Sequence, residues 1–258
     1  MFRLSKWYCD CVTDDGSAFV GYWARMGWGP FTLPYAAALY KSKGEPTRER
    51  SSLRKSRMPT RHGEELRWEC DRLGVRGTWS PVAPAVSRTL LETTDGTIEW
   101  HCHLPSAHAN IELDGVGRLS GPGYAEHLEM TVKPWKLPFD QLRWGRFLSA
   151  EDAVTWIEWR GVETKRWVFY NGSELEQVLF EPRRIELPGG HGVIALHDAA
   201  VLREGRLLST ALRNIPGAAL WLPRRMRNAY EAKWLAAGTL ETATGVSHGW
   251  AIHELVRL

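Results

Sequence analysis

Short segments of alternating apolar and polar residues recur along the whole chain, and this rhythm constrains the fold more than any other feature. In the second half, AVTWIEWRG, KRWVFYNG and GVIALHDAAVL follow one another at a spacing of roughly ten residues. The dipeptides Asp15-Gly16, Asp95-Gly96 and Asn171-Gly172 are typical of hairpin turns. Antiparallel sandwiches and meander barrels produce this pattern. We therefore predict an all-β fold.

The length of the chain leaves the number of domains open. A chain of 258 residues can bury one large β-domain or two small ones. Within the stretch from Gly121 to Phe147, Pro134 and Pro138 exclude a regular helix, and they fit a linker laid over a surface. Near Arg224 to Ala237 the pattern allows a short helix, or a loop that leads into a strand from Ala229.

Charge is nearly balanced, with 33 basic and 30 acidic residues and a net charge of +3, so we expect no nucleic-acid partner. The segment from Lys41 to Arg67 has a basic excess and few apolar residues, which is typical of a solvated loop. The alternative is a surface that makes peripheral contact with anionic lipid headgroups. The sequence does not predict an oligomeric state.

The cysteines and the N-terminus indicate a cellular compartment. Cys9 and Cys11 would share one face of a strand, too far apart for a comfortable disulfide, and Cys70 and Cys102 stand alone. Four thiols in a chain of this length suggest a reducing environment. Because MFRLSKWYCDC lacks the apolar core of a signal peptide and no apolar run reaches transmembrane length, we expect a cytoplasmic protein, with membrane association as a possibility.

The stretch from Gly121 to Phe147 concentrates titratable and aromatic side chains. Alternation places Tyr124 and Glu126 on one face of an extended segment and His127 on the other. A carboxyl group beside apolar neighbours has a raised pKa and can act as a general acid. The competing interpretation is a strand-to-linker junction whose polar groups are simply hydrogen-bonded.

Asp10 is a second candidate acid, because it lies in an aromatic strand with Trp7 and Tyr8. An acid kept protonated by apolar walls can protonate an alkene, and nearby indole rings can stabilise the cation that develops. For Asp10, an ordinary hydrogen bond or ion pair is the favoured interpretation.

Two histidines form an H-x-H pair on an expected strand. His101 and His103 would point to one face, and His108 follows closely. Two imidazoles and a third ligand can bind a metal, but neutral histidines that line a pocket or hydrogen-bond across strands are the favoured interpretation. No serine lies in a G-x-S-x-G elbow and no cysteine has an evident activating neighbour, so hydrolase chemistry is not expected.

The order of these motifs resembles the hydroxyneurosporene synthase (carotenoid 1,2-hydratase) family. The motifs are WYCD with the following DG turn, GPGYAEH, LRWGRF, VTWIEWRG and a strand that ends in NG, and they extend from Trp7 to about Asn171. The sequence differs from that family in having Glu126 where carotenoid hydratases have an aspartate-rich stretch, and in its shorter chain.

The resemblance implies two lipocalin-like (calycin-type) antiparallel β-barrel or sandwich domains in tandem. We place them at residues 1–122 and 123–258, with a linker at the start of the second domain contributing to the pocket. The resemblance also implies water addition, cyclisation or isomerisation of an apolar, isoprenoid-like or polyketide-like molecule, without a cofactor. The positions that match the motifs are Asp10, Tyr124, Glu126, His127, Trp144 and Arg146.

The leading hypothesis is therefore a cofactor-independent hydratase, cyclase or isomerase. In it Glu126 is the general acid, His127 is its partner or the base that positions water, and Asp10 is a further candidate catalytic group. Tyr8, Tyr124, Trp144, His101 and His103 would contact the substrate, and Arg146 would orient a carboxylate or hold the linker. The alternatives are a non-catalytic carrier of lipid or pigment and a metal-dependent enzyme that uses the His101/His103 face.

Overall fold

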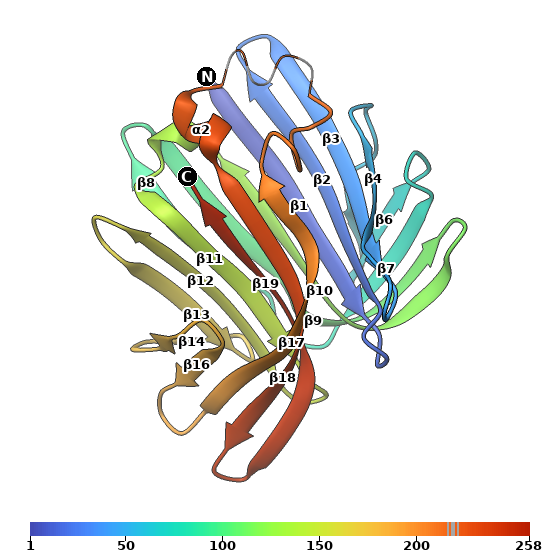
Figure 1. Ribbon diagram of the computed structural model, residues 1–258, viewed down its shortest axis with the longest axis vertical. Helices are drawn as coiled ribbons and strands as arrows, with labels where there is room; N and C mark the ends of the chain where they lie inside the picture. Colours follow the sequence, from blue (N-terminus) through green and yellow to red (C-terminus); the bar gives the residue numbers. More distant parts are fainter. Residues whose placement is uncertain (216, 218–219, 221) are drawn as a thin grey trace. The chain divides into compact units, whose positions relative to one another are not determined.

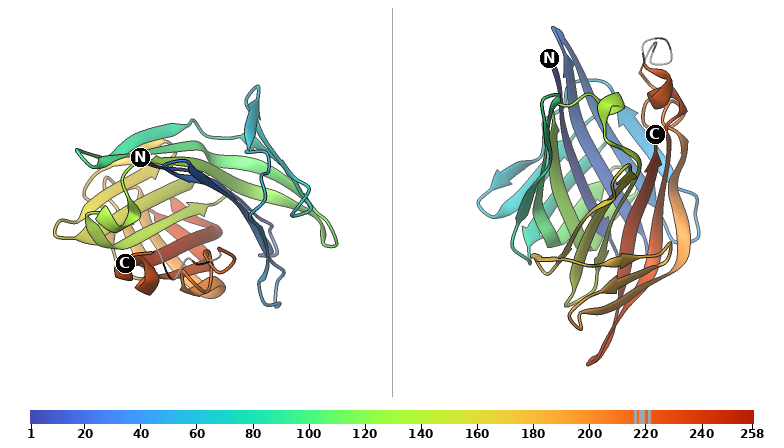
Figure 2. Two further views of the ribbon diagram at one scale, coloured as in Figure 1. Left: turned by 90° about the horizontal axis from the view of Figure 1, so that it is seen from above. Right: turned by 90° about the vertical axis from the view of Figure 1, so that its left-hand side faces the viewer.

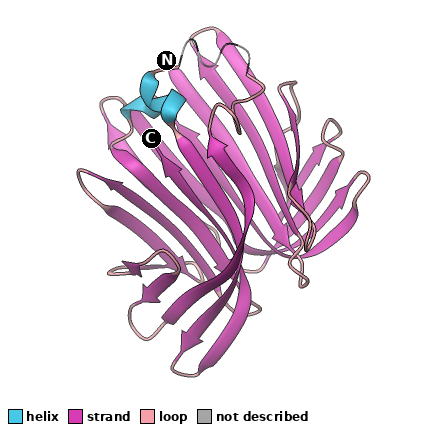
Figure 3. Ribbon diagram, viewed as in Figure 1, coloured by secondary structure: helices cyan, strands magenta, loops and turns pink. Residues whose placement is uncertain are grey.

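The computed structural model describes residues 1–215, 217, 220 and 222–258. Strands account for nearly all of its regular structure (Figure 3). The chain divides into two compact units, Met1–Leu137 and Pro138–Leu258, and each unit is built on one antiparallel sheet. The prediction of an all-β fold of two lipocalin-like halves is confirmed.

The first unit contains a 10-stranded sheet (Figure 1). Its strands are β1 (Phe2–Val12), β2 (Ala18–Trp28), β3 (Phe31–Lys41), β4 (Arg48–Ser52), β5 (Thr60–His62), β6 (Glu65–Cys70), β7 (Val75–Pro81), β8 (Val86–Thr93), β9 (Gly96–Leu113) and β10 (Gly117–Met130). Their order is β4-β3-β2-β1-β10-β9-β7-β6-β5, and β8 pairs with β9. A 3-10 turn, η1 (Pro134–Lys136), follows β10.

The second unit contains a nine-stranded sheet. Its strands are β11 (Phe139–Leu148), β12 (Ala153–Gly161), β13 (Lys165–Tyr170), β14 (Ser173–Leu175), β15 (Leu179–Phe180), β16 (Arg184–Leu187), β17 (Gly192–Arg206), β18 (Tyr230–Thr242) and β19 (Gly245–Arg257). The order is β14-β13-β12-β11-β19-β18-β17-β16-β15. A short helix, α2 (Arg224–Asn228), precedes β18. Among the described residues, no helix has the length and apolarity needed to span a membrane.

The two sheets repeat one topology. In each, the first strand of the unit lies between the second strand and the last, so β1 separates β2 from β10 and β11 separates β12 from β19. The sequence Gly123–His127 (GYAEH) on β10 corresponds to Gly249–His253 (GWAIH) on β19. His127 pairs with Trp7 of β1, and His253 pairs with Gly145 of β11. This internal repeat is a feature that the sequence analysis missed.

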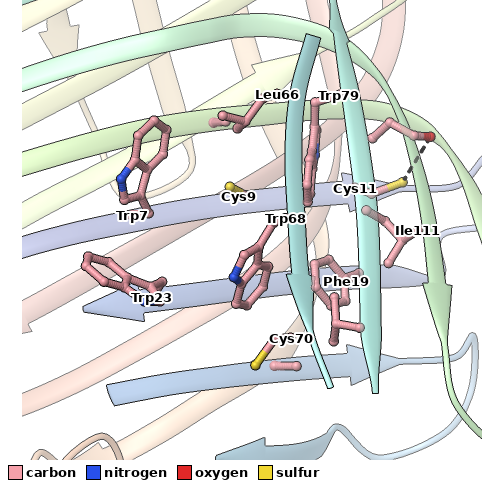
Figure 4. Packing of buried hydrophobic residues seen from close by; sticks show 14 of the residues in the cluster. Trp7, Cys9, Cys11, Phe19, Trp23, Leu66, Trp68, Cys70, Trp79 and Ile111 are labelled. Carbon is pink, nitrogen blue, oxygen red and sulfur yellow. Dashed lines mark hydrogen bonds between the residues drawn. The ribbon is translucent and has the colours of Figure 1, made fainter. Parts of the chain in front are cut away.

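The first sheet curls so that β6 and β7 pack across β1, β2 and β3 (Figures 2 and 4). Its inner face holds the apolar core. The labelled members in Figure 4 are Trp7, Cys9, Cys11, Phe19, Trp23, Leu66, Trp68, Cys70, Trp79 and Ile111. All four cysteines of the chain are buried free thiols, and Cys9 and Cys11 share this inner face as predicted. Burial raises the pKa of Cys9 and Cys102 well above the usual thiol value, so both stay protonated.

The second unit has its own core on one face of its sheet. The cluster comprises Phe147, Val154, Trp156, Val168, Val178, Ile185, Leu187, Ile194, Leu196, Ala236, Leu240 and Ala251. Because side chains alternate along a strand, Arg143 and Gly145 lie on the same face as Phe147, whereas Trp144 and Arg146 lie on the opposite face. We call the face that carries the core the inner face of each sheet and the opposite face the outer face.

The three predicted hairpin turns are present. Gly16 has φ of 82°, Gly96 has φ of 137°, and Asn171 and Gly172 have φ of 48° and 84°. A two-residue turn with positive φ at both positions matches the right-handed twist of the flanking strands, which explains why Asn-Gly joins β13 to β14.

Two expectations differ from the structure. The division between the units lies after Leu137 rather than after residue 122, because residues 123–130 are a central strand paired with both β1 and β9. The basic segment 41–67, expected to be a solvated loop, is largely exposed but contributes the short strands β4 and β5 and the start of β6. Near residue 224, where the sequence allowed a short helix or a loop that leads into a strand from Ala229, the structure has a short helix that ends at Asn228 and a strand that begins at Tyr230.

Gly21 on β2 offers a test of this packing. A Cβ at Gly21 would lie 2.4 Å from a ring carbon of Trp68, whereas a Cβ at Gly27 on the same strand would meet nothing closer than 3.9 Å. Gly21→Ala should therefore lower the free energy of unfolding by about 1–3 kcal/mol through overpacking, and Gly27→Ala should change it far less. Urea unfolding followed by tryptophan fluorescence measures both. An equal loss of stability in the two variants would show that Trp68 does not pack closely against Gly21.

Candidate functional site

Two tyrosine–carboxylate pairs lie side by side on the outer face of the first sheet. Tyr8 and Asp10 are on β1, Tyr124 and Glu126 are on β10, and Tyr8 faces Glu126 while Asp10 faces Tyr124 in the strand register. All four side chains point to one face because they occupy alternate positions on neighbouring strands. The prediction that Tyr124 and Glu126 share a face is confirmed.

Each tyrosine donates a hydrogen bond along its own strand. The hydroxyl of Tyr8 donates to Oδ2 of Asp10 over 2.9 Å, and that of Tyr124 donates to Oε2 of Glu126 over 2.6 Å. Nε1 of Trp100 on β9 donates to the same Glu126 oxygen, also over 2.6 Å. The exposed fractions of Asp10 and Glu126 are 0% and 9%. Buried carboxylates need such donors, because a buried carboxylate without a hydrogen bond lowers the stability of the fold by about 1–3 kcal/mol or more.

The surroundings of these carboxylates are aromatic. The ring of Tyr8 meets the rings of Tyr22 and Tyr124 edge to face, at centroid distances of 5.5 and 6.0 Å. Burial raises the pKa of Tyr124 well above that of an ordinary phenol, and the charges of Cys102 and Glu126 raise it further. Tyr124 therefore remains a neutral donor to Glu126 at physiological pH.

Trp100 is the member of this network that sequence reasoning missed. It lies on β9, and Glu126 is opposite Cys102 in the register of β9 and β10. Alternation along WHCH places Trp100 and Cys102 on one face and the two histidines on the other. Alternation thus indicates which residues of β9 share a face. The hydrogen bond between Trp100 and Glu126, however, depends on the pairing of β9 with β10.

His127 lies on the inner face of the sheet, whereas Glu126 lies on the outer face. Its Nε2 is 2.8 Å from Oγ of Ser5, and its ring stacks on Trp7 at a centroid distance of 4.8 Å. The expected partnership of His127 with Glu126 therefore does not match the geometry, because consecutive residues of a strand point to opposite faces.

His101 and His103 also lie on this inner face, and the ring of Trp7 stacks on His103 at 4.9 Å as well as on His127. The centroids of His101 and His103 are 6.1 Å apart, and each is 6.3 Å from that of His127. His108 is exposed between two core alanines and does not join them.

The histidine group does not have the arrangement of a metal centre. Among the described residues, no group of three or more His, Cys, Asp or Glu side chains is placed to hold a metal ion. Burial, followed by the charges of His127, Arg61 and His101, lowers the pKa of His103 to about 4. Burial is also the main cause of the lowered pKa of His127. Both shifts favour the neutral imidazole of His103 and His127 at physiological pH.

The two predicted residues of the second unit lie together on the outer face of its sheet. Trp144 is buried, with Nζ of Lys233 4.9 Å from its ring centroid. Arg146 is fully buried and donates from Nη1 to the carbonyl oxygen of Trp250 over 2.7 Å. Lys233 also forms a close ion pair with Glu254.

Glu231 is a further candidate acid that the sequence analysis did not identify. It is buried on β18 two residues before Lys233, and Nη1 of Arg203 is 3.8 Å from its Oε1. Burial, reinforced by the charge of Glu254, raises its pKa. The signal was present in YEAKWLAAG, where Glu231 and Lys233 alternate with apolar residues, but the ambiguity between helix and strand there hid the shared face.

A surface hollow lies away from these residues. It measures about 400 Å³ and is lined by side chains of β6, β7, β9 and β10, among them Arg67, Glu69, Arg76, Glu112 and Arg118. None of the predicted site residues lines it.

Solved structures share this fold although the sequence has no matching family. No family model matches the sequence, and no curated protein matches it. Kievitone hydratase from Nectria haematococca superposes with a TM-score of 0.60 at 11% identity, over 98% of this chain and 88% of that one. A complex of CghA with Sch210972 gives 0.56 at 11% identity, over 100% and 89% of the chains. A protein assigned as AttH from Nitrosomonas europaea gives 0.55 at 12%, over 98% and 92%. The fold agrees with the family that the motifs resemble.

The partly buried His103 predicts a pH dependence of stability. His103, with a folded pKa of about 4, binds fewer protons in the folded state than in the unfolded state, where its pKa is about 6.5. Its contribution to stability is therefore present above pH ~6.5 and is lost as the pH falls toward 4. Urea unfolding at several pH values should show this decline, and His103→Gln should make it shallower. Parallel curves for the variant and the parent protein would contradict the prediction.

Proposed function

We propose that the protein is a cofactor-independent hydratase, cyclase or isomerase that performs acid–base chemistry on an apolar unsaturated molecule. The observation that carries the proposal is the hydrogen-bonded group formed by Tyr124, Glu126 and Trp100 beside Tyr8 and Asp10. Two carboxyl groups and two phenols are buried together among aromatic rings, a setting suited to proton transfer and to stabilising a cation.

The proposed reaction uses Glu126 as the group that gives and takes a proton. Protonated Glu126 transfers its proton to one carbon of a double bond, and the neighbouring carbon becomes cationic. In a hydration, water adds to that carbon and the extra proton of the added water returns to a carboxylate. In a cyclisation or isomerisation, an electron pair of the substrate itself neutralises the cation and a proton is released. Tyr124, held neutral by its raised pKa, keeps the carboxyl group oriented.

The remaining predicted residues have supporting roles in this proposal. Asp10, which accepts from Tyr8, is the second acid–base group. Arg146 holds its own segment of the second unit in place by donating to the carbonyl oxygen of Trp250, and neither it nor Trp144 is given a role beside Glu126. His127 is not assigned the role of partner to Glu126, because the structure places it on the other face of the sheet.

The comparisons support the reaction class through the fold. A structure that matches almost the whole chain is named a hydratase, and the motif resemblance is to carotenoid hydratases. At this level of identity a shared fold does not carry over individual roles, which must come from the residues themselves. The isoprenoid-like or polyketide-like substrate belongs to the proposal on the resemblance alone.

The test uses deuterium incorporation. The purified protein is incubated in D₂O with a panel of linear isoprenoid and polyketide polyenes, and the products are analysed by liquid chromatography and mass spectrometry. The proposal expects at least one polyene to yield a hydrate or an isomer with deuterium on carbon. Glu126→Gln should reduce the rate by about 10²–10⁴-fold with the fold intact, because it removes the proton and keeps the shape.

Two further variants locate the acid. Tyr124→Phe should slow the reaction less than Glu126→Gln, because it leaves the carboxyl group in place. Glu231→Gln is the matched control, a buried glutamate of the second unit with a raised pKa. Loss of activity in Glu231→Gln with full activity in Glu126→Gln would move the acid to the second unit. Polyenes that bind but stay unchanged in the parent protein would identify a carrier instead.

A further inference from the structure

Arg143 on β11 is a partly buried arginine that the proposed reaction does not use. Its side chain is 22% exposed and lies on the inner face of the second sheet. Among the residues that the structure describes, its nearest carboxylate is Glu158, whose Oε2 lies 3.9 Å from Nε, beyond hydrogen-bond distance. The guanidinium therefore has donors available to another acceptor.

Glu158 is already engaged by two other arginines. Its carboxylate is 0% exposed, with Oε2 accepting from Nε of Arg160 over 2.8 Å and Oε1 accepting from Nε of Arg166 over 2.9 Å. Three guanidinium groups thus surround one carboxylate. Burial and the charges of Arg160 and Arg257 lower the pKa of Arg143, whereas Glu158 only partly opposes them. The group carries an excess of positive charge.

His253 on β19 adds a second unsatisfied group to the same face. Its Nε2 is buried and has no hydrogen-bond partner within the described part of the chain. The ring stacks on Trp234 at a centroid distance of 5.1 Å. His253 is opposite Gly145 in the register, and Arg143 is two residues from Gly145 on that face, so Arg143 and His253 are diagonal neighbours. Burial and the charges of Lys233, Arg143 and Arg183 lower the pKa of His253 to about 4.

The internal repeat shows what is different in this half. In the first sheet, His127 occupies the corresponding position. Its Nε2 is hydrogen-bonded to Ser5, which lies on β1 two residues before Trp7, the residue opposite His127. The position that corresponds to Ser5 in the second sheet is Arg143. Where the first sheet has the hydroxyl of Ser5 hydrogen-bonded to the imidazole, the second sheet has the guanidinium of Arg143, which does not bond to His253. Both Arg143 and His253 therefore have hydrogen-bonding groups available to a ligand.

We propose that Arg143 and His253, with Arg160 and Arg166 beside them, form a binding site for a small oxyanion, a carboxylate or a phosphate. The planar guanidinium of Arg143 would donate two hydrogen bonds to the anion, and the neutral imidazole would donate a third from Nε2. The anion would also balance the excess charge around Glu158. Arg160 and Arg166 are 37% and 43% exposed, so a small anion can reach their guanidinium groups from solvent. This site lies within the second unit and is independent of the proposed reaction.

The test is isothermal titration calorimetry with three probes: sodium benzoate, inorganic phosphate, and benzamide as the uncharged counterpart of benzoate. We expect the parent protein to bind benzoate, phosphate or both, and to bind benzamide at least ten times more weakly. Preference for benzoate would identify a carboxylate ligand, and preference for phosphate would identify a phosphate ligand. Binding of neither anion, or equal binding of benzoate and benzamide, would overturn the proposal.

Variants assign the binding to these residues. Arg143→Gln should weaken binding of the anion about 10- to 100-fold, because hydrogen bonds to charged groups are the strong ones. His253→Phe keeps a stacking ring on Trp234 but removes Nε2, and should also weaken binding. Arg184→Gln is the matched control, because Arg184 is an arginine of the same unit already paired with Glu186. Unchanged affinity in both Arg143→Gln and His253→Phe, in protein with native circular dichroism, would overturn the assignment.

Because the readout is binding, the result is separate from the polyene assay. Glu126 and Tyr124 are intact in every variant used here. Failure of the oxyanion site would therefore leave the proposed reaction to its own test, and inactivity of Glu126→Gln would say nothing about Arg143.

Discussion

The need to satisfy buried charge governs both halves of this protein. β1, which carries Asp10, and β12, which carries Glu158, each have a neighbouring strand on both sides, so both faces of each strand are available for burial. Asp10 and Glu158 are completely buried, and each depends on donors aimed at it: a tyrosine for the first, arginines for the second. Removing one donor would leave a carboxylate without its hydrogen bond, which costs more than the bond itself contributes.

The choice of donor decides what each carboxylate can do. A phenol such as Tyr124 is neutral, so its hydrogen bond does not add a full positive charge beside Glu126. Two guanidinium groups donate to Glu158 and place full positive charges beside it, because arginine remains charged at any physiological pH. Glu126 is for this reason the better candidate for a group that exchanges a proton, and Glu158 the better candidate for a structural partner of the arginines.

The strands and turns could be predicted from the sequence because their signals are local. Alternation and the Asp-Gly and Asn-Gly pairs are properties of neighbouring residues, and the structure has strands and turns where they indicated. The division between the units was placed too early because it depends on which strands pair across the chain. Residues 123–130 belong to the first sheet only because β10 fits between β1 and β9. The strands β4 and β5 were missed because their residues are largely polar and exposed, so they have no apolar face to reveal them. The same distinction holds for the site: alternation joined Tyr124 to Glu126, but only pairing between distant strands joins Trp100 to them.

The repeat also shows why residue roles should not be transferred from one half to the other by position. The inner face of β1 presents Trp7 opposite Trp23, whereas β11 presents Gly145 opposite Trp156. A side chain at Gly145 could not be accommodated, because its Cβ would lie 2.3 Å from the ring of Trp156. In the first half, Trp7 therefore stands between two imidazoles and stacks on both. In the second half, glycine allows an indole from the neighbouring strand to lie over the backbone, and His253 stacks on Trp234 instead. One backbone topology thus supports two different interiors, because exchanging a large residue for glycine on one strand changes which neighbour fills the space and which polar atoms remain to be satisfied.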